Sequence, residues 1–302
     1  MVIIDKNNIP DVPTVVALGI FDGVHLGHRR VITGAGEYAA GSGALPAVFT
    51  FKTSTVTTKG RRGAILTDAD KLAHFAELGT EYVFIADFAD LRELSPARFV
   101  REVLHGQMHA SAVVCGQNFH FGKGGTAGSG ELSALCAGFG IKTIVVPPFL
   151  IGGERVSTTR IRELVKSGGI SVANSLLGYR FYYELEVSRG AQLGREWDFP
   201  TINQQIPAEL IMPRFGVYCV KVIIDGREYP GVCNVGVKPT VGRDNSPLAE
   251  THIIGFSGDL YGKTIRTEFY EFVRPEMKFA GFDELKAEIR RNTEFARQYF
   301  EN

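Results

Sequence analysis

The chain has 302 residues, 44% of them hydrophobic, which is enough for two domains of ordinary size, each with its own core. Lys and Arg (33) balance Asp and Glu (33), which excludes the broad positive field that attracts nucleic acid or an anionic membrane. The four cysteines form no Cys-x-x-Cys pair, and no apolar stretch approaches the ~20 residues of a membrane span. We therefore expect a soluble, cytoplasmic protein without a zinc site or disulfide framework, which binds small molecules and neither nucleic acid nor membrane; no oligomer is predicted.

Apolar runs rich in Val, Ile and Phe recur through the first half of the chain, as in strands buried on both faces of a parallel sheet. These runs cover residues 15–21, 45–51, 82–85, 112–115 and 141–146. Helical spacing lies between them at 68–78 and at 95–104, where Ser95-Pro96 provides a cap and a first helical residue. The alternation predicts five parallel strands in a doubly wound α/β sheet.

The second half of the chain has a period of two, which predicts an antiparallel sheet or barrel. The period-two segments are 182–187, 216–224, 229–235, 251–254 and 264–272. Residues 282–300 have helical spacing and predict a terminal helix packed on the sheet. We place the domain boundary within 167–180, which gives predicted domains 1–180 and 181–302.

The strongest cluster of polar residues is Gly-Ile-Phe-Asp-Gly-Val-His-Leu-Gly-His at 19–28, between the first predicted strand and a helix. The carboxyl end of a strand in an open α/β sheet is where ligands bind, and a helix N-terminus there favours phosphate. His25 and His28 could both donate hydrogen bonds to a departing pyrophosphate, and Gly23 and Gly27 would allow close backbone approach. The alternatives are two surface histidines after a tight turn, or two zinc ligands without companions.

A second cluster, Arg-Val-Ser-Thr-Thr-Arg-Ile-Arg at 155–162, follows the fifth predicted strand and begins another helix. The hydroxyls of Ser157 and Thr158 stand at the helix cap, with the guanidinium groups of Arg160 and Arg162 behind them. Capping hydroxyls, free amides and Arg side chains together favour an anion. The alternative is an ordinary capped helix with a solvated basic face.

The informative stretch of the second half runs from 188 to 203. A glycine-bearing loop that includes Gly194 and Arg195 could fold over phosphates, while Thr201 and Asn203 offer hard oxygen ligands to Mg²⁺. A mobile hairpin loop followed by a turn stiffened by Pro200 is the alternative.

These motifs resemble a known family. The clusters at 19–28 and 157–162 are similar to the paired motifs of the nucleotidylyltransferase superfamily, and more narrowly to the adenylyltransferase half of prokaryotic bifunctional riboflavin kinase/FAD synthetases. Gly-Gln-Asn-Phe-His-Phe-Gly at 116–122 resembles the stretch that lies beside nucleotide and flavin in that family. Phe-Pro-Thr-Ile-Asn at 199–203 resembles the Mg²⁺-binding motif of riboflavin kinases, and downstream segments, including Glu-Thr-His at 250–252, follow the family in order.

The resemblance implies a Rossmann-like nucleotidylyltransferase domain followed by a Greek-key barrel, which phosphorylates riboflavin to FMN and adenylylates FMN to FAD. ATP is the co-substrate and Mg²⁺ the metal in both reactions. In the second reaction, the FMN phosphate attacks the α-phosphorus of ATP in line and no protein nucleophile is required.

The resemblance also assigns residue roles. The implied catalytic residues are Glu268, as base toward the ribityl hydroxyl with Glu271 as its competitor, and His25, His28 and Arg160. The implied ATP or phosphate ligands are Gly19, Phe21, Asp22, Gly27, Ser157, Thr158, Arg162, Gly194 and Arg195. The implied flavin contacts are Asn118, Phe119 and the flap residue Arg274, and the metal ligands are Thr201 and Asn203.

The sequence departs from the family pattern in three places, one of which is the absence of the family's glycine near Glu186, ahead of the loop. Lys52-Thr53-Ser54 stands where Asp or Glu followed by Pro-His-Pro is usual, and Asp198 replaces a glycine. They motivate an alternative, a riboflavin kinase whose adenylyltransferase half is weakened or altered in substrate. A flavin-sensing regulator without turnover is a third hypothesis.

Overall fold

The computed structural model describes residues 1–5, 7–56, 63–189, 200–237 and 247–301. Its contacts divide the chain into two compact units, Met1–Thr158 and Thr159–Asn302. Helix α8 (Ile170–Leu177) groups with the second unit because the Asn174 side chain donates to the Phe269 carbonyl (2.9 Å) and accepts from the Phe181 amide (2.7 Å). The units therefore meet earlier in the chain than the predicted boundary segment, and the domain limits 1–180 and 181–302 stay a prediction.

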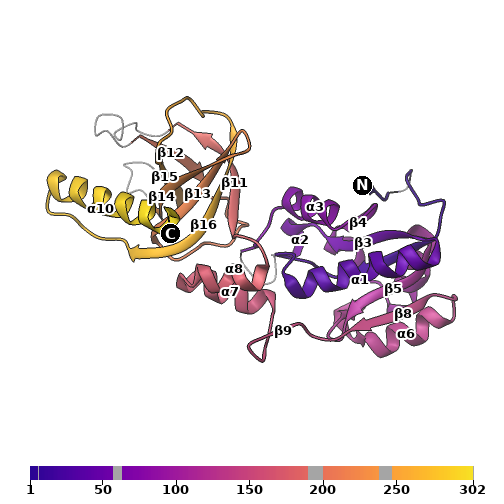
Figure 1. The fold of residues 1–302 in the computed structure, drawn as a ribbon. Coiled ribbons are helices and arrows are strands. Elements are labelled where there is room, and N and C mark those ends of the chain that lie inside the picture. Colours follow the sequence, from indigo (N-terminus) through magenta and orange to yellow (C-terminus); the bar gives the residue numbers. More distant parts are fainter. Residues whose placement is uncertain (6, 57–62, 190–199, 238–246, 302) are drawn as a thin grey trace. The chain divides into compact units, whose positions relative to one another are not determined.

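The first unit contains a six-stranded parallel sheet in the order β1-β4-β3-β2-β5-β8 (Figure 1). The strands are β1 (Val2–Ile3), β2 (Thr14–Leu18), β3 (Leu45–Phe51), β4 (Tyr82–Ala86), β5 (Ala110–Gly116) and β8 (Lys142–Val146). The five predicted strands are confirmed. The edge strand β1 was not predicted, because two residues are too short to form a periodic pattern.

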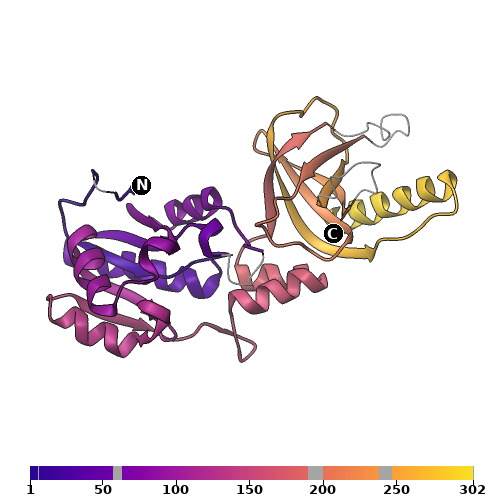
Figure 2. The ribbon, with the colours of Figure 1, turned by 180° about the vertical axis from the view of Figure 1, so that it is seen from behind.

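Helices cover both faces of this sheet (Figures 1 and 2). On one face, Gly34 of α1 lies against Val114 of β5; on the other, the π-helix η1 packs with the neighbouring Val113 and Cys115. Side chains of a strand alternate between faces, so the sheet is doubly wound as predicted. The helices of this unit are α1 (Leu26–Ser42), α2 (Thr53–Val56), α3 (Asp68–Glu77), α4 (Phe88–Leu91), α5 (Pro96–Arg98), η1 (Phe99–Gln107), the 3₁₀ turn η2 (Lys123–Gly125) and α6 (Ser129–Ala137).

Two short hairpins complete the first unit. Strand β6 (His120–Phe121) pairs with β7 (Ala127–Gly128), and β9 (Leu150–Ile151) pairs with β10 (Glu154–Arg155). The second hairpin immediately precedes Val156, whose amide donates to the Phe149 carbonyl (2.9 Å).

Local sequence signals explain the helix starts. Thr67 and Asp70 form a reciprocal capping box at α3, and the Ser95 hydroxyl accepts from the Arg98 amide at the start of α5. The predicted helices at 68–78 and 95–104 are thus confirmed, the second continuing as the π-helix η1.

Strand order determines where a ligand can bind in the first unit. Strand β2 pairs with β3 on one side and with β5 on the other. The chain thus adds strands in opposite directions from β2, and in open α/β sheets such a switch point is the preferred ligand site. The loop from β2 to α1, which carries the first predicted cluster, lies at this point.

The second unit is a closed antiparallel barrel in the order β11-β12-β15-β14-β13-β16 (Figure 1). Strands β13, β14 and β15 are consecutive neighbours and β12 returns beside β15, which is a Greek-key arrangement. The elements are α7 (Thr158–Ser167), α8, β11 (Tyr182–Ser188), β12 (Thr201–Gln205), β13 (Gly216–Ile224), β14 (Arg227–Val237), β15 (Pro247–Ile253), β16 (Thr264–Pro275) and α10 (Phe282–Glu301).

Strand β12 was not predicted, because its sequence is polar rather than alternating. Gln204 nevertheless points into the barrel and is fully buried. Its amide nitrogen donates to the carbonyls of Leu185 (2.9 Å) and Ile265 (2.7 Å), and its oxygen accepts from the Thr267 hydroxyl (2.8 Å). A fully bonded polar side chain thus replaces an apolar one at this core position.

The barrel has an aromatic interior and an apolar patch outside. Tyr183, Tyr218 and Phe269 are buried and pack edge to face inside it. On the outside, Val217 and Cys219 of β13 belong to a cluster that includes residues of α10, so the predicted terminal helix is confirmed (Figure 1). Within the described part of the chain, no helix combines the length and apolar character needed to cross a bilayer.

Candidate active sites

The turn after β2 has an unusual backbone. Phe21 (φ 52°), Gly23 (φ 78°) and Val24 (φ 27°) all have positive φ, which costs energy for the two bulky residues. A Cβ at Gly23 would also lie 2.8 Å from Ile65 Cδ1, so glycine is required there. Strain of this kind persists where the surrounding structure holds a site in place.

The two histidines lie directly behind this turn. His25 is the N-cap of α1, and its Nδ1 accepts a hydrogen bond from the His28 amide (3.2 Å). The rings are stacked with centroids 3.6 Å apart and planes at 17°. Because Nδ1 of His25 is an acceptor, the proton of the neutral ring is on Nε2, which can donate to a ligand.

Both imidazoles are neutral at pH 7. Burial, together with the positive charge of Arg155, lowers the pKa of His25 to about 4 despite an opposing backbone hydrogen bond. Burial lowers the pKa of His28 well below its ordinary value, with further contributions from His25 and Arg155. Arg155 was not predicted as a site residue, although it begins the cluster at 155–162.

Phe21 and Asp22 hold the turn in place. The buried Phe21 ring meets the His28 ring edge-on, with centroids 5.3 Å apart. Asp22 Oδ1 accepts from the Ile65 amide (2.9 Å), and its carbonyl accepts from the Thr158 hydroxyl (3.2 Å). These side chains, expected to contact ATP, thus bond within the fold around the histidines.

The predicted glycines leave room for the aromatic rings of the site. A Cβ at Gly19 would lie 2.7 Å from Phe21 Cε1, and one at Gly27 would lie 3.2 Å from His25 Cε1. Ser157 is half-buried just before α7. Arg160 and Arg162 are half-buried on α7, in the second unit.

Aromatic side chains gather at the carboxyl ends of β3, β4 and β5. Phe49 contacts Phe51 and Phe84, with centroids 5.2 and 5.8 Å apart. Phe119 stacks on Phe121 at 5.7 Å and 16°, and the exposed Asn118 precedes it. The aromatic cluster, as we name it, comprises Phe49, Phe51, Phe84, Phe88, Phe99, Phe119 and Phe121.

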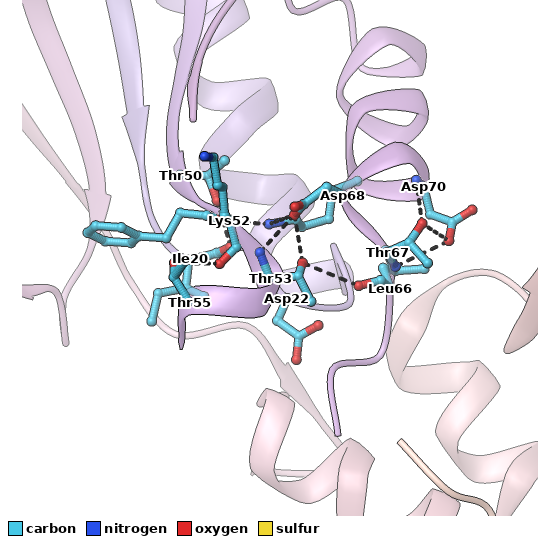
Figure 3. Close-up of polar contacts among 12 residues, drawn as sticks. Ile20, Asp22, Thr50, Lys52, Thr53, Thr55, Leu66, Thr67, Asp68 and Asp70 are labelled. Atoms are coloured by element: carbon cyan, nitrogen blue, oxygen red, sulfur yellow. Dashed lines mark hydrogen bonds and ion pairs between the residues drawn. The ribbon is translucent and has the colours of Figure 1, made fainter. Parts of the chain in front are cut away.

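The segment that departs from the family pattern begins α2. Asp68 Oδ1 accepts from both the amide (2.9 Å) and the hydroxyl (2.7 Å) of Thr53 (Figure 3). A proline at this position would have no amide hydrogen to donate. The lost rigidity of proline is here replaced by two hydrogen bonds to α3.

In the second unit, Thr201 and Asn203 lie on β12 beside a carboxylate. Asn203 is directly opposite Glu250 of β15, and the Thr201 hydroxyl donates to Glu250 Oε1 (3.1 Å). Asn234 of β14 is opposite Glu250 on its other side. Glu250 was missed as a site residue; the alternation that buries Thr251 and places Glu250 outside the barrel was the available signal.

Glu268 is not brought to this place. It lies opposite Tyr182 at the start of β11, whereas Asn203 lies opposite Ser188 at the end, six residues further on. At ~3.3 Å per residue the two positions are roughly 20 Å apart along the strand. The Tyr270 hydroxyl instead contacts Glu268 Oε2 (3.4 Å).

Glu268 and Glu271 have different neighbours. Burial raises the pKa of Glu268, against the lowering effect of Arg266. Glu271 lies opposite Cys219, and its Oε1 accepts from the Phe272 amide (3.2 Å).

Arg274 connects β16 to the terminal helix. Its Nε lies 3.0 Å from Glu288 Oε1 of α10, and both side chains are largely buried. Gly194 and Arg195, the predicted phosphate-binding loop residues, lie outside the described residues.

The described residues contain no group of three or more His, Cys, Asp or Glu side chains placed to hold a metal. The hydroxyl of Thr201, the amide of Asn203 and the carboxylate of Glu250 are hard oxygen donors on neighbouring strands. Mg²⁺ in phosphate-transferring enzymes typically takes one or two protein ligands and completes its shell with phosphates and water, so this donor set fits it.

The fold and the two candidate sites are typical of a class, a two-part transferase: an α/β sheet with a histidine pair at its switch point is followed by a β-barrel that carries a set of hard oxygen donors. The family model described as FAD synthetase matches residues 8–160, and the riboflavin kinase model matches 177–300. The bifunctional riboflavin kinase/FMN adenylyltransferase of Bacillus subtilis is 34% identical, covering 96% of this chain and 93% of that protein. The Escherichia coli K12 protein of the same description is 32% identical, covering 96% and 94%.

The chain belongs to the family of bifunctional riboflavin kinase/FMN adenylyltransferases. It phosphorylates riboflavin to FMN and adenylylates FMN to FAD, as predicted. A crystal structure from Streptococcus pneumoniae, described as a macrolide-efflux protein, has a TM-score of 0.87 to this chain, 27% identity and 98% coverage of both chains.

Proposed function

We propose that the stacked histidine pair is the centre of adenylyl transfer, because it places neutral imidazoles at the switch point of the sheet, behind a strained turn. His25 Nε2 and the ring of His28 donate to the triphosphate as charge moves onto the departing pyrophosphate. The positive charge of Arg155 acts on both imidazoles. The hydroxyls of Ser157 and Thr158 belong to this phosphate site. Arg160 and Arg162, which follow them in the same sequence motif, are proposed as phosphate ligands because the family resemblance implies that role.

The reaction requires positioning rather than a protein nucleophile. A phosphate oxygen of FMN forms a bond to the α-phosphorus of ATP, and the bond to the bridging oxygen of pyrophosphate breaks in line. The protein supplies hydrogen bonds and charge that strengthen in the transition state.

Replacing Gly27 by alanine tests the position of the histidine pair. The new Cβ would lie 3.2 Å from Cε1 and 3.3 Å from Nδ1 of His25, so the ring must move. We expect FAD formation from FMN to fall about tenfold, since small displacements of catalytic groups are costly. Gly36→Ala in the same helix, where the Cβ meets nothing within 4 Å, should leave activity unchanged; equal activity of both variants would contradict the assignment.

The depressed histidine pKa values predict acid sensitivity of the first unit. In the unfolded chain a histidine takes up a proton as pH falls through about 6.5, whereas folded His25 stays neutral to about 4. The contribution of His25 to the free energy of unfolding is therefore fully present above pH 6.5. It is lost as the pH decreases toward 4, and the loss is on the order of 3 kcal/mol. Denaturant titrations at pH 7.5, 6 and 5 measure the free energy of unfolding. It should decrease less with falling pH in His25→Gln than in the unsubstituted protein; an identical decrease in both would refute the prediction.

We further propose that the flavin ring of FMN binds at the half-buried rings of the aromatic cluster, with Asn118 and Phe119 at its edge. Phe49, Phe99 and Phe121 are buried and belong to the hydrophobic core of the sheet. The cluster lies at the carboxyl ends of β3, β4 and β5, on the same edge of the sheet as the histidine turn. Offset stacking on phenyl rings suits a flat heteroaromatic ligand.

For the kinase reaction, we propose Glu250 as the base that accepts the proton of the riboflavin hydroxyl. The observation that supports it is the bond from the Thr201 hydroxyl to Glu250, beside Asn203. Thr201 and Asn203 would hold Mg²⁺ with the ATP phosphates, and that ion neutralises charge on the transferring phosphoryl group. Glu268, the base implied by the family resemblance, remains the competing proposal.

The remaining roles follow the sequence predictions. Gly194 and Arg195 are proposed to contact ATP phosphates, and Arg274 is proposed to contact flavin, in competition with its pairing to Glu288. A cytoplasmic location, with small-molecule substrates alone as partners, is also proposed; cell fractionation tests it. Incubation with riboflavin, ATP and Mg²⁺, followed by chromatographic separation of FMN and FAD, measures both reactions, and omitting Mg²⁺ should stop both.

A further inference from the structure

Helix α3 of the first unit contains a buried lysine that has no role in either proposed site. Lys71 of α3 is 2% exposed. Its Nζ donates to the Phe51 carbonyl (2.7 Å) and lies 3.1 Å from Asp68 Oδ1. Burying an ammonium group is costly unless it is paired and hydrogen-bonded, and here one contact goes to the last residue of β3.

Asp68 links Lys71 to the chain that follows β3. The same Oδ1 accepts from the amide and the hydroxyl of Thr53 (Figure 3). Burial raises the pKa of Asp68, but the charge of Lys71 and the bonds from Thr53 outweigh it, so the pKa is lowered. Asp68 is therefore ionised at neutral pH and holds Lys71 and Thr53 together.

Hydrogen bonds also link the end of β3 and the residues before α3 to the histidine turn. The buried Thr50 donates its hydroxyl to the Ile20 carbonyl (2.7 Å), immediately before Phe21 (Figure 3). On the other side, Asp22 accepts from the amide of Ile65, three residues before α3. The end of β3, the turn after β2 and the start of α3 thus form one hydrogen-bonded unit.

We propose that Lys71 and Asp68 are positioning residues for adenylyl transfer. They hold the Phe51 carbonyl and Thr53, and thereby set the Phe51 ring of the aromatic cluster relative to the histidine turn. In the proposed sites, the flavin binds near the Phe51 ring and the triphosphate binds at the histidine turn. Loss of the contacts made by Lys71 and Asp68 would therefore displace the attacking phosphate of FMN from the α-phosphorus of ATP. The proposal rests on the adenylyl and flavin sites proposed above.

The test is Lys71→Met, which removes the charge and keeps the length. We expect kcat/KM for FMN in FAD formation to fall about 10- to 100-fold, largely in kcat, because a shift near 1 Å is enough for such a loss. Riboflavin phosphorylation by the same molecules should stay within about twofold. Lys142→Met, at an exposed lysine of β8, is the control and should leave both reactions unchanged.

Two further variants separate positioning from stability. Thr53→Val removes one hydrogen bond to Asp68 and should lower the rate of FAD formation by about threefold to tenfold. The rate for Asp68→Asn should lie between those of Thr53→Val and Lys71→Met. All assays run well below each variant's unfolding midpoint. Normal FAD formation in folded Lys71→Met would overturn the proposal, and so would a loss of activity that is explained by the unfolded fraction alone. If Lys71→Met does not fold, normal FAD formation in both Thr53→Val and Asp68→Asn would overturn it. Normal FAD formation in a His28 variant would instead overturn the adenylyl site.

Discussion

Replacing Glu250 by glutamine should lower FMN formation from riboflavin by about 10²- to 10⁴-fold, the usual contribution of a general base. The amide keeps the shape and can still accept from Thr201, but it cannot take the hydroxyl proton. FAD formation from supplied FMN should remain within about twofold, because that reaction is assigned to the first unit. Separate assays of the two half-reactions measure both effects.

Glu268→Gln is the matched comparison. Glu268 of β16 is opposite Tyr182, whereas Asn203 of β12 is opposite Ser188, six residues further along β11. Because Glu268 is far from Asn203, we expect its replacement to change FMN formation by less than about threefold. If Glu268→Gln abolished FMN formation and Glu250→Gln did not, the strand register would have misidentified the base and the implied role of Glu268 would be correct.

Replacing His28 by alanine should lower FAD formation from FMN by about 10²- to 10³-fold, as expected for loss of one transition-state donor. His28 is held by the stacked His25 ring and the edge-on Phe21 ring, so it is already oriented before a ligand binds. FMN formation should not change, which makes the kinase reaction an internal control for protein concentration and integrity.

The control for His28 is His105→Ala, at an exposed histidine of η1. Both variants should unfold at temperatures well above that of the assay. Unchanged FAD formation in His28→Ala, or an equal loss in His105→Ala, would contradict the role of the histidine pair.

Much of the fold could be predicted, because buried parallel strands and amphipathic helices leave strong periodic patterns. Strands β2, β3, β4, β5 and β8 are runs of apolar residues, and the helix that begins at Ser95-Pro96 starts where the sequence predicted it. Among the strands that were not predicted, β1 and β12 have clear physical explanations. β1 has only two residues, and β12 buries Gln204, whose hydrogen bonds inside the barrel cannot be inferred from hydropathy.

The candidate sites were predicted unevenly. His25, His28 and the glycines between strand and helix are close in sequence, so a local motif contains them all. The neighbours of Thr201 depend on which strands pair and in which register, and this register places Glu250 beside Thr201 and Asn203, with Glu268 further along the barrel. No local pattern contains that information.

The sequence by itself determined the α/β and β-barrel halves, the histidine turn, and the two reactions that its motifs imply, because each depends on residues near one another in the chain. Only the tertiary structure decided which carboxylate lies beside Thr201 and Asn203, that Phe21 and Asp22 contact other parts of the fold, and that Asp68 binds both Lys71 and Thr53. The physical reason is that strand register and the burial of charge bring together residues far apart in the chain, and the partner is chosen by the whole fold.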